Sequence, residues 1–409
     1  MWKESYPSGR RGDYSLDPTG FLPYIKASMS ISRRRILRGL GASALVGSVS
    51  PKFHSFAFTA SGEAQEAVGD ARDPIHLDRN ESAYGPSSKA LEAMRGELGS
   101  AHRYPNSEYG PLIEKIAASH KVDPSHVVLG AGSREILRMA AEAYLSRRNQ
   151  LVLGAPTFDP IAHFAESRGA GVIAVPLNRR YEHDLDGMLA RIDASTGLVY
   201  ICNPNNPTGT LTPRRDLEAF VRKLPAHTAV VIDEAYHHYV AASSDYASFI
   251  DSPVNDDRVV VLRTFSKIYG LAGMRVGYGV ASPRVAQTLS ASSVPLGVGL
   301  LAAKAAFAAL DDHDFVRAAA GRNRDDRQEF FNQSNARMLR WIDSQTNFVM
   351  LNGGLPPQKI IDHYQKNGIL LGPLIPEMPK FVRCSIGTTP EMLRFWRVWD
   401  SLPPHRMAM

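Results

Sequence analysis

One lysine of the sequence stands among residues that would draw it into a structured site. In the stretch RTFSKIYGLAGMR, residues 263–275, Lys267 follows two hydroxyl-bearing residues and precedes two glycines and Arg275. Most lysines are solvated and have no chemical role. The flanks here are apolar or small, so we expect Lys267 to belong to a chemical site rather than to the surface.

Several expected strands end in residues that could bind a ligand. The segment GAGS, residues 130–133, precedes an expected helix, so the backbone N–H groups of Ser133 and Arg134 could hold a phosphate at the helix N-terminus. As a dinucleotide fingerprint the segment is incomplete, because Glu135 stands where the third glycine would be. Asp233 ends the buried run VVID and needs a cationic or hydrogen-bonding partner, since burying an unpaired carboxylate is costly.

Two kinds of partner, a metal ion and a nucleic acid, are disfavoured. His237 and His238 follow Asp233 closely, but adjacent residues of an extended segment point to opposite faces, so no metal site is predicted. Residues 1–60 carry nine Lys and Arg against three Asp and Glu, which accounts for the whole net charge of +6. The rest of the chain is neutral, and this argues against a nucleic-acid surface.

From about residue 85 the sequence alternates between helical and strand periods. The expected helix SSKALEAMRGELG has Ser87 or Ser88 as a candidate N-cap. Runs that are typical of parallel strands buried on both faces are HVVLGAGS, QLVLGAPTF, GVIAVPL, GLVYIC, TAVVID and RVVVLRTFS. The alternation predicts an α/β fold with a doubly wound, mostly parallel central sheet, whose ligands bind at the carboxyl ends of the strands.

After about residue 305 the pattern changes to a long helix, DDRQEFFNQSNARMLRWI, and two strands, NFVMLN and FVRCSIG. We therefore predict a leader over residues 1–60, an N-terminal arm over 75–105, a large ligand-binding domain over 106–305 and a smaller α+β domain over 306–409. Cys202 and Cys384 lie in apolar strand-like runs. A disulfide between them is possible, but buried free thiols are expected in a chain of this size.

The leader contains a candidate targeting signal. In SRRRILRGLGASALVGSVS, residues 32–50, three arginines precede a short, weakly apolar run, which resembles the bacterial twin-arginine export signal. This predicts a periplasmic or exported protein. The alternative is a basic amphipathic tail on a cytoplasmic protein. No stable membrane anchor is predicted, because no other segment has enough uninterrupted apolar residues to cross a bilayer.

Five motifs in one order carry a family resemblance. They are GAGS, PTF, NPNNPTG, DEAY and TFSKIYGLAGMR, and the segments LDRNESAYGPS, RYPNSEYGPL, TNFVML and VRCSIGT add to them. From about residue 75 to residue 400 the chain resembles a fold-type-I pyridoxal-phosphate (PLP) enzyme of the class I/II aminotransferases. Within these it is most similar to the histidinol-phosphate aminotransferase family. The resemblance implies a PLP-dependent aminotransferase that works as a homodimer on an amino acid and a 2-oxo acid.

The resemblance also implies roles for residues around the cofactor ring. Lys267 would form the Schiff base with PLP, and its freed amine would move the proton from the substrate Cα to the cofactor. Asp233 would pair with the pyridinium nitrogen. Tyr236 and Asn206 would hydrogen-bond the ring oxygen. Phe158, where many relatives carry tyrosine, would stack on the ring face.

Further roles concern the cofactor phosphate and the substrate. The resemblance implies that the phosphate is held by Ser133, Arg134, Thr264, Ser266 and Arg275. Tyr104 matches the tyrosine that reaches the phosphate from the neighbouring subunit. Arg383 would bind the substrate carboxylate bidentately, and Tyr84 would also contact the substrate. Taken singly, Arg383 could instead be an ion pair at a domain interface, and Phe158 could be core packing.

The sequence departs from the histidinol-phosphate pattern at two positions. The family usually carries an arginine in the stretch written here GILLGPLIP, where this chain has Gly372, and an asparagine where Met392 stands. Because the arginine would help to hold the substrate phosphate, we expect an amino acid with an apolar or aromatic side chain to be favoured over histidinol phosphate. The alternatives are a PLP-dependent decarboxylase or lyase on the same scaffold, and a binding module without catalysis.

Overall fold

The structure is a computed structural model that describes residues 73–105, 107–241, 243, 245–251 and 256–403. The predicted leader and its arginines lie outside the described residues. Within the described segments no helix is long and apolar enough to cross a membrane. The described residues fall in one compact unit, so the predicted boundaries near residues 105 and 305 stay predictions.

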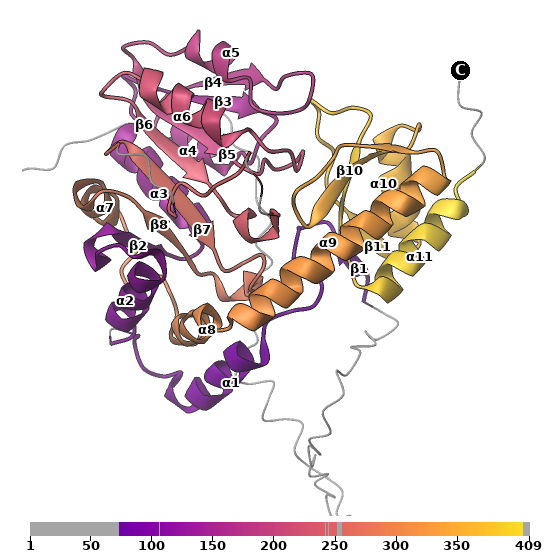
Figure 1. Ribbon diagram of the computed structural model, residues 1–409, viewed down its shortest axis with the longest axis horizontal. Helices are drawn as coiled ribbons and strands as arrows, with labels where there is room; N and C mark the ends of the chain where they lie inside the picture. The colour runs from indigo at the N-terminus through magenta and orange to yellow at the C-terminus, as the bar shows by residue number, and fades with distance from the viewer. Residues whose placement is uncertain (1–72, 106, 242, 244, 252–255, 404–409) are drawn as a thin grey trace, which may run out of the picture. The chain divides into compact units, whose positions relative to one another are not determined.

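A seven-stranded sheet forms the centre of the fold (Figure 1). Its order is β2-β8-β7-β6-β5-β3-β4, and every neighbouring pair is parallel except the two pairs that β8 makes. The strands are β2 (Val127–Gly130), β3 (Gln150–Ala155), β4 (Gly171–Pro176), β5 (Thr196–Cys202), β6 (Ala229–Asp233), β7 (Val259–Thr264) and β8 (Gly277–Val280). The mostly parallel α/β sheet expected from the sequence is confirmed. Strand β8 was not predicted, because its sequence GYGV is short and rich in glycine.

Most residues of the central strands are apolar because helices cover both faces of the sheet. Alternate side chains of one strand enter different cores: Val199 and Ile201 enter one, and Leu198 and Tyr200 enter the other. The second core is completed by α3 (Ser133–Tyr144), α4 (Pro160–Ser167) and α7 (Pro283–Ser290). The first is completed by α1 (Ser88–Glu97), α2 (Tyr109–His120), α5 (Leu185–Leu189), α6 (Arg214–Lys223) and α8 (Leu300–Leu310). Ser87, one of the two candidate caps, accepts a hydrogen bond from the Ala90 N–H at the start of α1.

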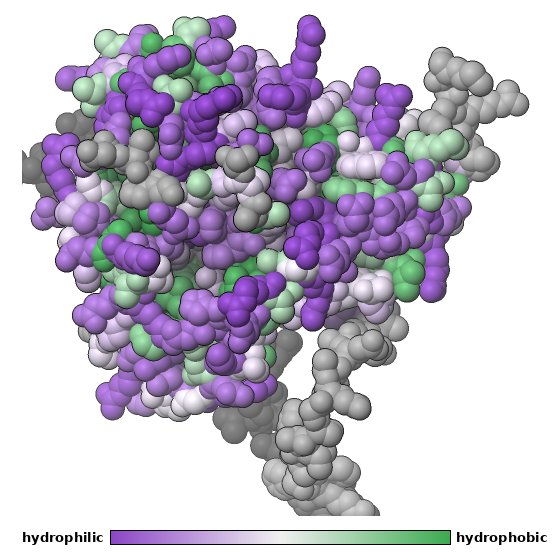
Figure 2. All heavy atoms as spheres, in the orientation of Figure 1, coloured by the Kyte–Doolittle hydropathy of each residue, from purple (hydrophilic) through white to green (hydrophobic). Residues whose placement is uncertain are grey.

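The C-terminal part builds two small sheets. Strand β10 (Phe348–Asn352) lies between β12 (Val382–Ser385) and β9 (Arg340–Trp341), and β1 (Ile75–Leu77) pairs in parallel with β11 (Ile369–Leu371). Around them lie α9 (His313–Ala336), α10 (Pro357–Lys366) and α11 (Thr389–Asp400). The face of α9 seen in Figure 2 is mainly hydrophilic. The buried residues of this helix are Arg327, Phe330 and Ser334. The helix predicted over residues 325–342 ends earlier, because Arg340 and Trp341 pair with β10.

The interior contains two free thiols and a buried ion pair. Cys202 and Cys384 are both buried free thiols, as the preferred alternative predicted. A fully buried ion pair joins Arg263 of β7 to Glu234, which follows β6, with 2.8 Å between Nη2 and Oε2. This pair lies directly beside Asp233 and Thr264 in sequence and fixes the carboxyl ends of the two strands relative to each other.

Candidate active site

A cavity of about 1350 Å³ opens at the carboxyl ends of the central strands. The last residues of four neighbouring strands line it, namely Ala155, Cys202, Asp233 and Thr264. Residues 78–81, which follow β1, and the segment 373–377 add walls from distant parts of the chain. The cavity brings together most of the predicted site residues: Ser133, Arg134, Phe158, Asn206, Asp233, Tyr236, Thr264, Ser266, Lys267, Arg275 and Arg383.

Asp233 is a buried carboxylate that has no cationic hydrogen-bond partner among the described residues. One oxygen accepts a hydrogen bond from the Tyr200 hydroxyl at 3.0 Å, and the other accepts one from the Ala235 N–H at 3.0 Å. Burial raises the pKa of Asp233 to about 6, although both hydrogen bonds oppose the rise. The charged form is therefore costly here, and a protonated ring nitrogen in the cavity would lower that cost.

This buried carboxylate predicts a pH-dependent stability for the cofactor-free protein. The pKa of Asp233 is about 6 in the folded state against 3.8 as the ordinary value, so the group stabilises the fold at low pH and loses this contribution as the pH rises to 6. The loss is up to about 3 kcal/mol. Denaturant unfolding at pH 4 to 7 of the cofactor-free protein and of Asp233→Asn measures it. The difference between the two should shift in favour of the variant as the pH rises, and a constant difference would contradict this account.

Lys267 is held in the cavity by backbone carbonyls. Its Nζ donates hydrogen bonds to Asn80 O at 2.9 Å and to Arg79 O at 3.2 Å. Burial lowers the pKa of Lys267 to about 8, and the nearby guanidinium of Arg383 adds to this effect. A lowered pKa gives the amine a larger uncharged fraction near neutral pH, which both a nucleophile and a general base require.

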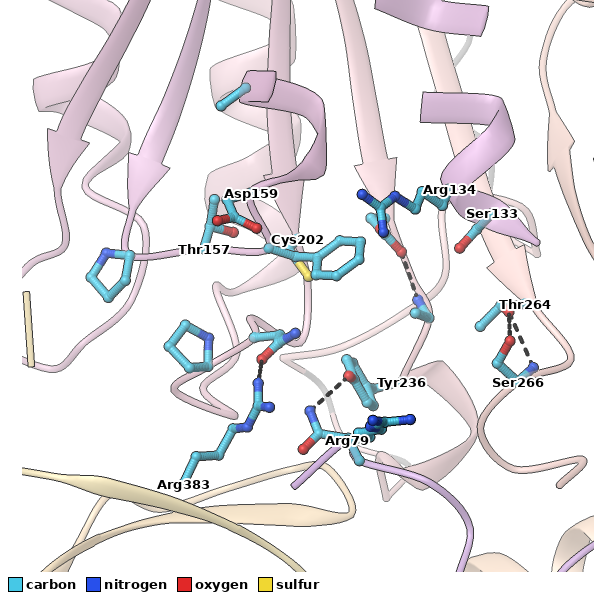
Figure 3. Close-up of a pocket in the computed structure, with 18 of the residues that line it drawn as sticks. Arg79, Ser133, Arg134, Thr157, Asp159, Cys202, Tyr236, Thr264, Ser266 and Arg383 are labelled. Atoms are coloured by element: carbon cyan, nitrogen blue, oxygen red, sulfur yellow. Dashed lines mark hydrogen bonds between the residues drawn. The ribbon is translucent and has the colours of Figure 1, made fainter. Parts of the chain in front are cut away.

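A group of polar residues suited to binding an anion lies at one end of the cavity. The N-cap of α3 is Gly132, which provides no side-chain cap, and the first two residues of the helix, Ser133 and Arg134, line the cavity. Ser133, Thr264 and Ser266 lie together on one side of the cavity, away from Arg383 (Figure 3). Thr264 donates to Ser266 Oγ at 3.0 Å, and Arg275 Nη1 donates to the same oxygen at 3.2 Å.

The same end of the cavity depends on close backbone packing. A Cβ on Gly132, whose φ is +81°, would collide with the guanidinium of Arg275. A Cβ on Gly277 would lie 2.5 Å from the Ser133 nitrogen. Arg275 itself adopts a left-handed conformation with φ of 54°, which is uncommon for a residue with a side chain. The two glycines thus allow the Arg275 guanidinium to lie close to the N-terminus of α3, an arrangement that suits a phosphate.

Arg383 of β12 reaches the cavity from the C-terminal part of the chain (Figure 3). Its Nη1 donates to Asn206 Oδ1 at 2.8 Å, and its Nη2 donates to Asp78 O at 2.7 Å. Burial lowers the pKa of Arg383, and its Nε is buried without a hydrogen-bond partner among the described residues. The guanidinium is thus oriented by two neutral acceptors and keeps its charge free for an anionic ligand.

Two predicted residues lie outside this cavity. The Tyr84 hydroxyl donates to Asp326 at 3.0 Å, and the Arg322 guanidinium lies 4.3 Å from the centre of its ring. Tyr104 is 78% exposed. The predicted role of Tyr104 belongs to a neighbouring subunit and stays a prediction, and the structure does not bring Tyr84 to the site of its own chain.

Three residues of the site were not predicted from the sequence. Asn80 contacts both Lys267 and Tyr236, Tyr200 donates to Asp233, and Cys202 lines the cavity. Asn80 lies in a motif that contributed to the resemblance, and this was a usable signal. Tyr200 carried no signal, because an aromatic residue in an apolar strand is typical of a core. Within the described residues no group of three or more His, Cys, Asp and Glu could hold a metal ion.

Residues 72–395 match the family described as Aminotransferase class I and II. The chain belongs to this family. The aminotransferase resembles the histidinol-phosphate aminotransferase of Staphylococcus carnosus, at 37% identity over 76% of this chain and 86% of the relative. It also resembles the histidinol-phosphate aminotransferase of Geobacillus sp., at 36% identity over 73% and 81% of the two chains.

Solved structures agree with the fold. The histidinol-phosphate aminotransferase from Sinorhizobium meliloti, solved in complex with pyridoxal-5'-phosphate, superposes on the aminotransferase with a TM-score of 0.74. It shares 26% identity over 85% of this chain and 98% of the other. Thermus thermophilus aspartate aminotransferase shows the same fold, with a TM-score of 0.68. It shares 21% identity over 80% of this chain and 92% of the other. The predicted fold-type-I architecture and the PLP-dependent aminotransferase class are confirmed.

The cavity of the aminotransferase fits its cofactor. One end has a helix N-terminus without a side-chain cap, two hydroxyls and Arg275, which together suit an anion. The cavity also contains Asp233, a buried carboxylate whose ionisation needs a cationic partner. It contains Lys267, whose pKa is lowered. PLP carries an anionic phosphate, a basic ring nitrogen and an aldehyde, so each of its three groups has a complementary residue.

Proposed function

We propose that the aminotransferase moves an amino group between an amino acid with an apolar or aromatic side chain and a 2-oxo acid. When bound, PLP supplies an electron sink for the bonds of the substrate Cα. Lys267 would hold the cofactor and, once released, move the proton of the substrate Cα. Its pKa of about 8 supports this role, because a general base works best when its pKa is close to the working pH.

The other residues of the cavity bind and orient. The N–H groups that begin α3, with Thr264, Ser266 and Arg275, would hold the cofactor phosphate. Asp233 would keep the ring nitrogen protonated. Tyr236 and Asn206 would bind the ring oxygen, and Phe158, which lines the cavity, would pack against the ring. Arg383 would bind the substrate carboxylate, and its hydrogen bond to Asn206 would align these two residues.

The proposed substrate preference rests on the wall of the cavity beside Arg383. This wall consists of Pro373, Leu374, Ile375 and Pro376, followed by the acidic Glu377. Before it stands Gly372, where a Cβ would lie 3.1 Å from the Arg383 Cβ, Nε and O atoms. An apolar wall that ends in a carboxylate favours an apolar or aromatic side chain over a phosphate, which would lose a charge-assisted hydrogen bond and face repulsion.

A second candidate substrate is histidinol phosphate. It is favoured by the names of the similar proteins from Staphylococcus carnosus and Geobacillus sp.. Two arginines, Arg79 and Arg134, also line the cavity and could meet a phosphate. The two candidates differ in the charge at the far end of the substrate, so a single comparison of donors separates them.

Steady-state kinetics with a panel of amino donors tests the proposal. We expect kcat/KM for the best aromatic or aliphatic amino acid to exceed that for histidinol phosphate by about tenfold or more, the value of one charge-assisted hydrogen bond. Production of the 2-oxo acid is the readout, and carbon dioxide is followed in parallel. A higher kcat/KM for histidinol phosphate would reverse the assignment, and carbon dioxide without 2-oxo acid would indicate a decarboxylase.

Two further proposals concern the setting of the enzyme. We propose that it works as a homodimer in which Tyr104 of each subunit reaches the other's cofactor phosphate. We also propose that the leader directs export through its twin-arginine sequence. The first rests on the family resemblance, and the second rests on the arginines of residues 33–35, which lie outside the described residues.

A further inference from the structure

Asn80 contacts two of the proposed cofactor residues, Lys267 and Tyr236, although no role has been given to it. It is 2% exposed and adopts a left-handed conformation with φ of 55°. Its Nδ2 donates to the Tyr236 hydroxyl at 3.1 Å, and its carbonyl accepts from Lys267 Nζ at 2.9 Å. The geometry points to Asn80 as a positioning residue: it turns the Tyr236 hydroxyl into a donor toward the cofactor and holds the Lys267 amine in the cavity.

The hydrogen bonds of Ser385 determine the orientation of the Asn80 amide. The Ser385 hydroxyl accepts from the Asn80 N–H at 2.8 Å and donates to Asn80 Oδ1 at 3.3 Å. The side-chain oxygen of Asn80 is therefore an acceptor, and its Nδ2, which can only donate, faces Tyr236. The Tyr236 oxygen must accept this hydrogen bond, so its own proton remains available.

The Tyr236 hydroxyl can donate its proton only into the cavity. Among the described residues no acceptor for it is found, and Tyr236 lines the cavity. The proton would therefore be donated to a ligand atom there, which under the proposed function is the ring oxygen of the cofactor. Burial raises the pKa of Tyr236, and the Asn80 hydrogen bond opposes this rise. Without Asn80 the hydroxyl could rotate or donate elsewhere.

Asn80 also connects the small C-terminal sheet to the cofactor residues. Ser385 lies two residues after Arg383 on β12, so both side chains leave the same face of that strand. Asn347, just before β10, donates from Nδ2 to Asn80 O at 3.2 Å and to Glu81 O at 2.9 Å. The predicted substrate residue Arg383 and the predicted cofactor residue Tyr236 are thus joined through Ser385 and Asn80.

The left-handed backbone of Asn80 allows a clean series of variants. Asparagine, aspartate and glycine are the residues that adopt this conformation most readily. Asn80→Asp keeps the shape but replaces the donor with a carboxylate, which would accept the Tyr236 proton. Asn80→Gly keeps the backbone and removes the amide. A further variant, Ser385→Ala, keeps Asn80 but removes the hydroxyl that orients it.

The test is a pH titration of the visible absorption of the PLP-loaded protein. The apparent pKa of the bound cofactor should rise in all three variants, because the Tyr236 proton no longer stabilises the anionic ring oxygen. The rise should be about one unit or more in Asn80→Asp and smaller in Asn80→Gly and Ser385→Ala. Asn80→Gly and Ser385→Ala leave the charged groups around Tyr236, which are Arg383, Asp233 and Lys267, unchanged. Asn80→Asp adds a carboxylate whose own charge also raises the pKa of the bound cofactor, so the two neutral variants decide whether positioning is lost. Thermal unfolding of the same samples reports any loss of structure.

The possible results separate positioning from packing. A variant with a lower melting temperature but an unshifted titration would show that Asn80 only packs the arm, and it would overturn the inference. If Asn80→Asp does not fold, the direction of the shift in Ser385→Ala decides. The inference rests on the proposed function, so a parent protein without any pH-dependent cofactor band would overturn both. A normal parent band with unshifted variants would overturn this inference alone.

Discussion

Replacement of Lys267 by alanine should reduce kcat on the order of 10⁴-fold or more. The variant loses the amine that would hold the cofactor and also the general base that would move the Cα proton, and one such base alone contributes up to about 10⁴-fold. The fold should survive, because burial lowers the pKa of Lys267 and makes its charged form costly. Single-turnover and steady-state rates with the best amino acid donor measure the effect.

A matched control for this variant is Lys304→Ala. Unlike Lys267, Lys304 forms ion pairs within the described part of the chain, with Glu97 and Glu108. It lies outside the cavity, and its side chain is 30% exposed. Its removal should leave kcat unchanged, since partly exposed ion pairs contribute little. If Lys267→Ala kept more than about a hundredth of the parent rate while bound to PLP, another residue would be the base.

The second large effect is expected at Arg383. Arg383→Ala should lower kcat/KM for amino acids and 2-oxo acids about 10³-fold, because it removes the partner of a buried carboxylate, a loss of 2–5 kcal/mol or more. Arg383→Lys should recover only part of the loss, since an ammonium cannot bind a carboxylate through two parallel hydrogen bonds. Both variants should raise KM more strongly than they lower kcat.

Arg79→Ala provides the control for Arg383. Arg79 also lines the cavity, but its side chain is 69% exposed and its nearest carboxylate oxygen, in Asp78, lies 3.4 Å away. Its loss should change kcat/KM for amino acids by less than about tenfold. Equal effects of the two arginine variants on amino acids would contradict the assignment of the carboxylate to Arg383. A larger effect of Arg79→Ala on histidinol phosphate than on amino acids would favour the second candidate substrate.

The central fold was predictable from the sequence because its signals are local. Strands β3, β5, β6 and β7 are nearly continuous apolar runs, and this pattern follows from burial between two helical layers. Strand β4 is also apolar in sequence, but it lies at the edge of the sheet and only Val175 of it is buried. The chemical residues were predictable because Asp233 and Thr264 end such runs, where parallel strands open toward a ligand. Lys267 stood out by its apolar and small flanks, and the family motifs supplied the roles.

The remaining features depend on contacts between distant segments. Strands β1, β9 and β11 have two or three residues each, so no period can reveal them, and they form only because a partner is present. Asn80 enters the site through the pairing of β1 with β11, which places residues 78–81 against Lys267. Tyr84 was predicted from its motif alone, and its contact with Asp326 of α9 could not be read from that motif.

Chemical fixation of the cofactor would show which lysine forms the Schiff base with PLP. The full-length protein is incubated with PLP, reduced with borohydride, digested, and analysed by mass spectrometry to locate the lysine that carries the cofactor. We expect Lys267 to be modified in the parent protein and no lysine to be modified in Lys267→Ala under the same conditions. Modification of another lysine in the parent, or equal labelling of parent and variant, would contradict the assignment of Lys267 and the mechanism built on it.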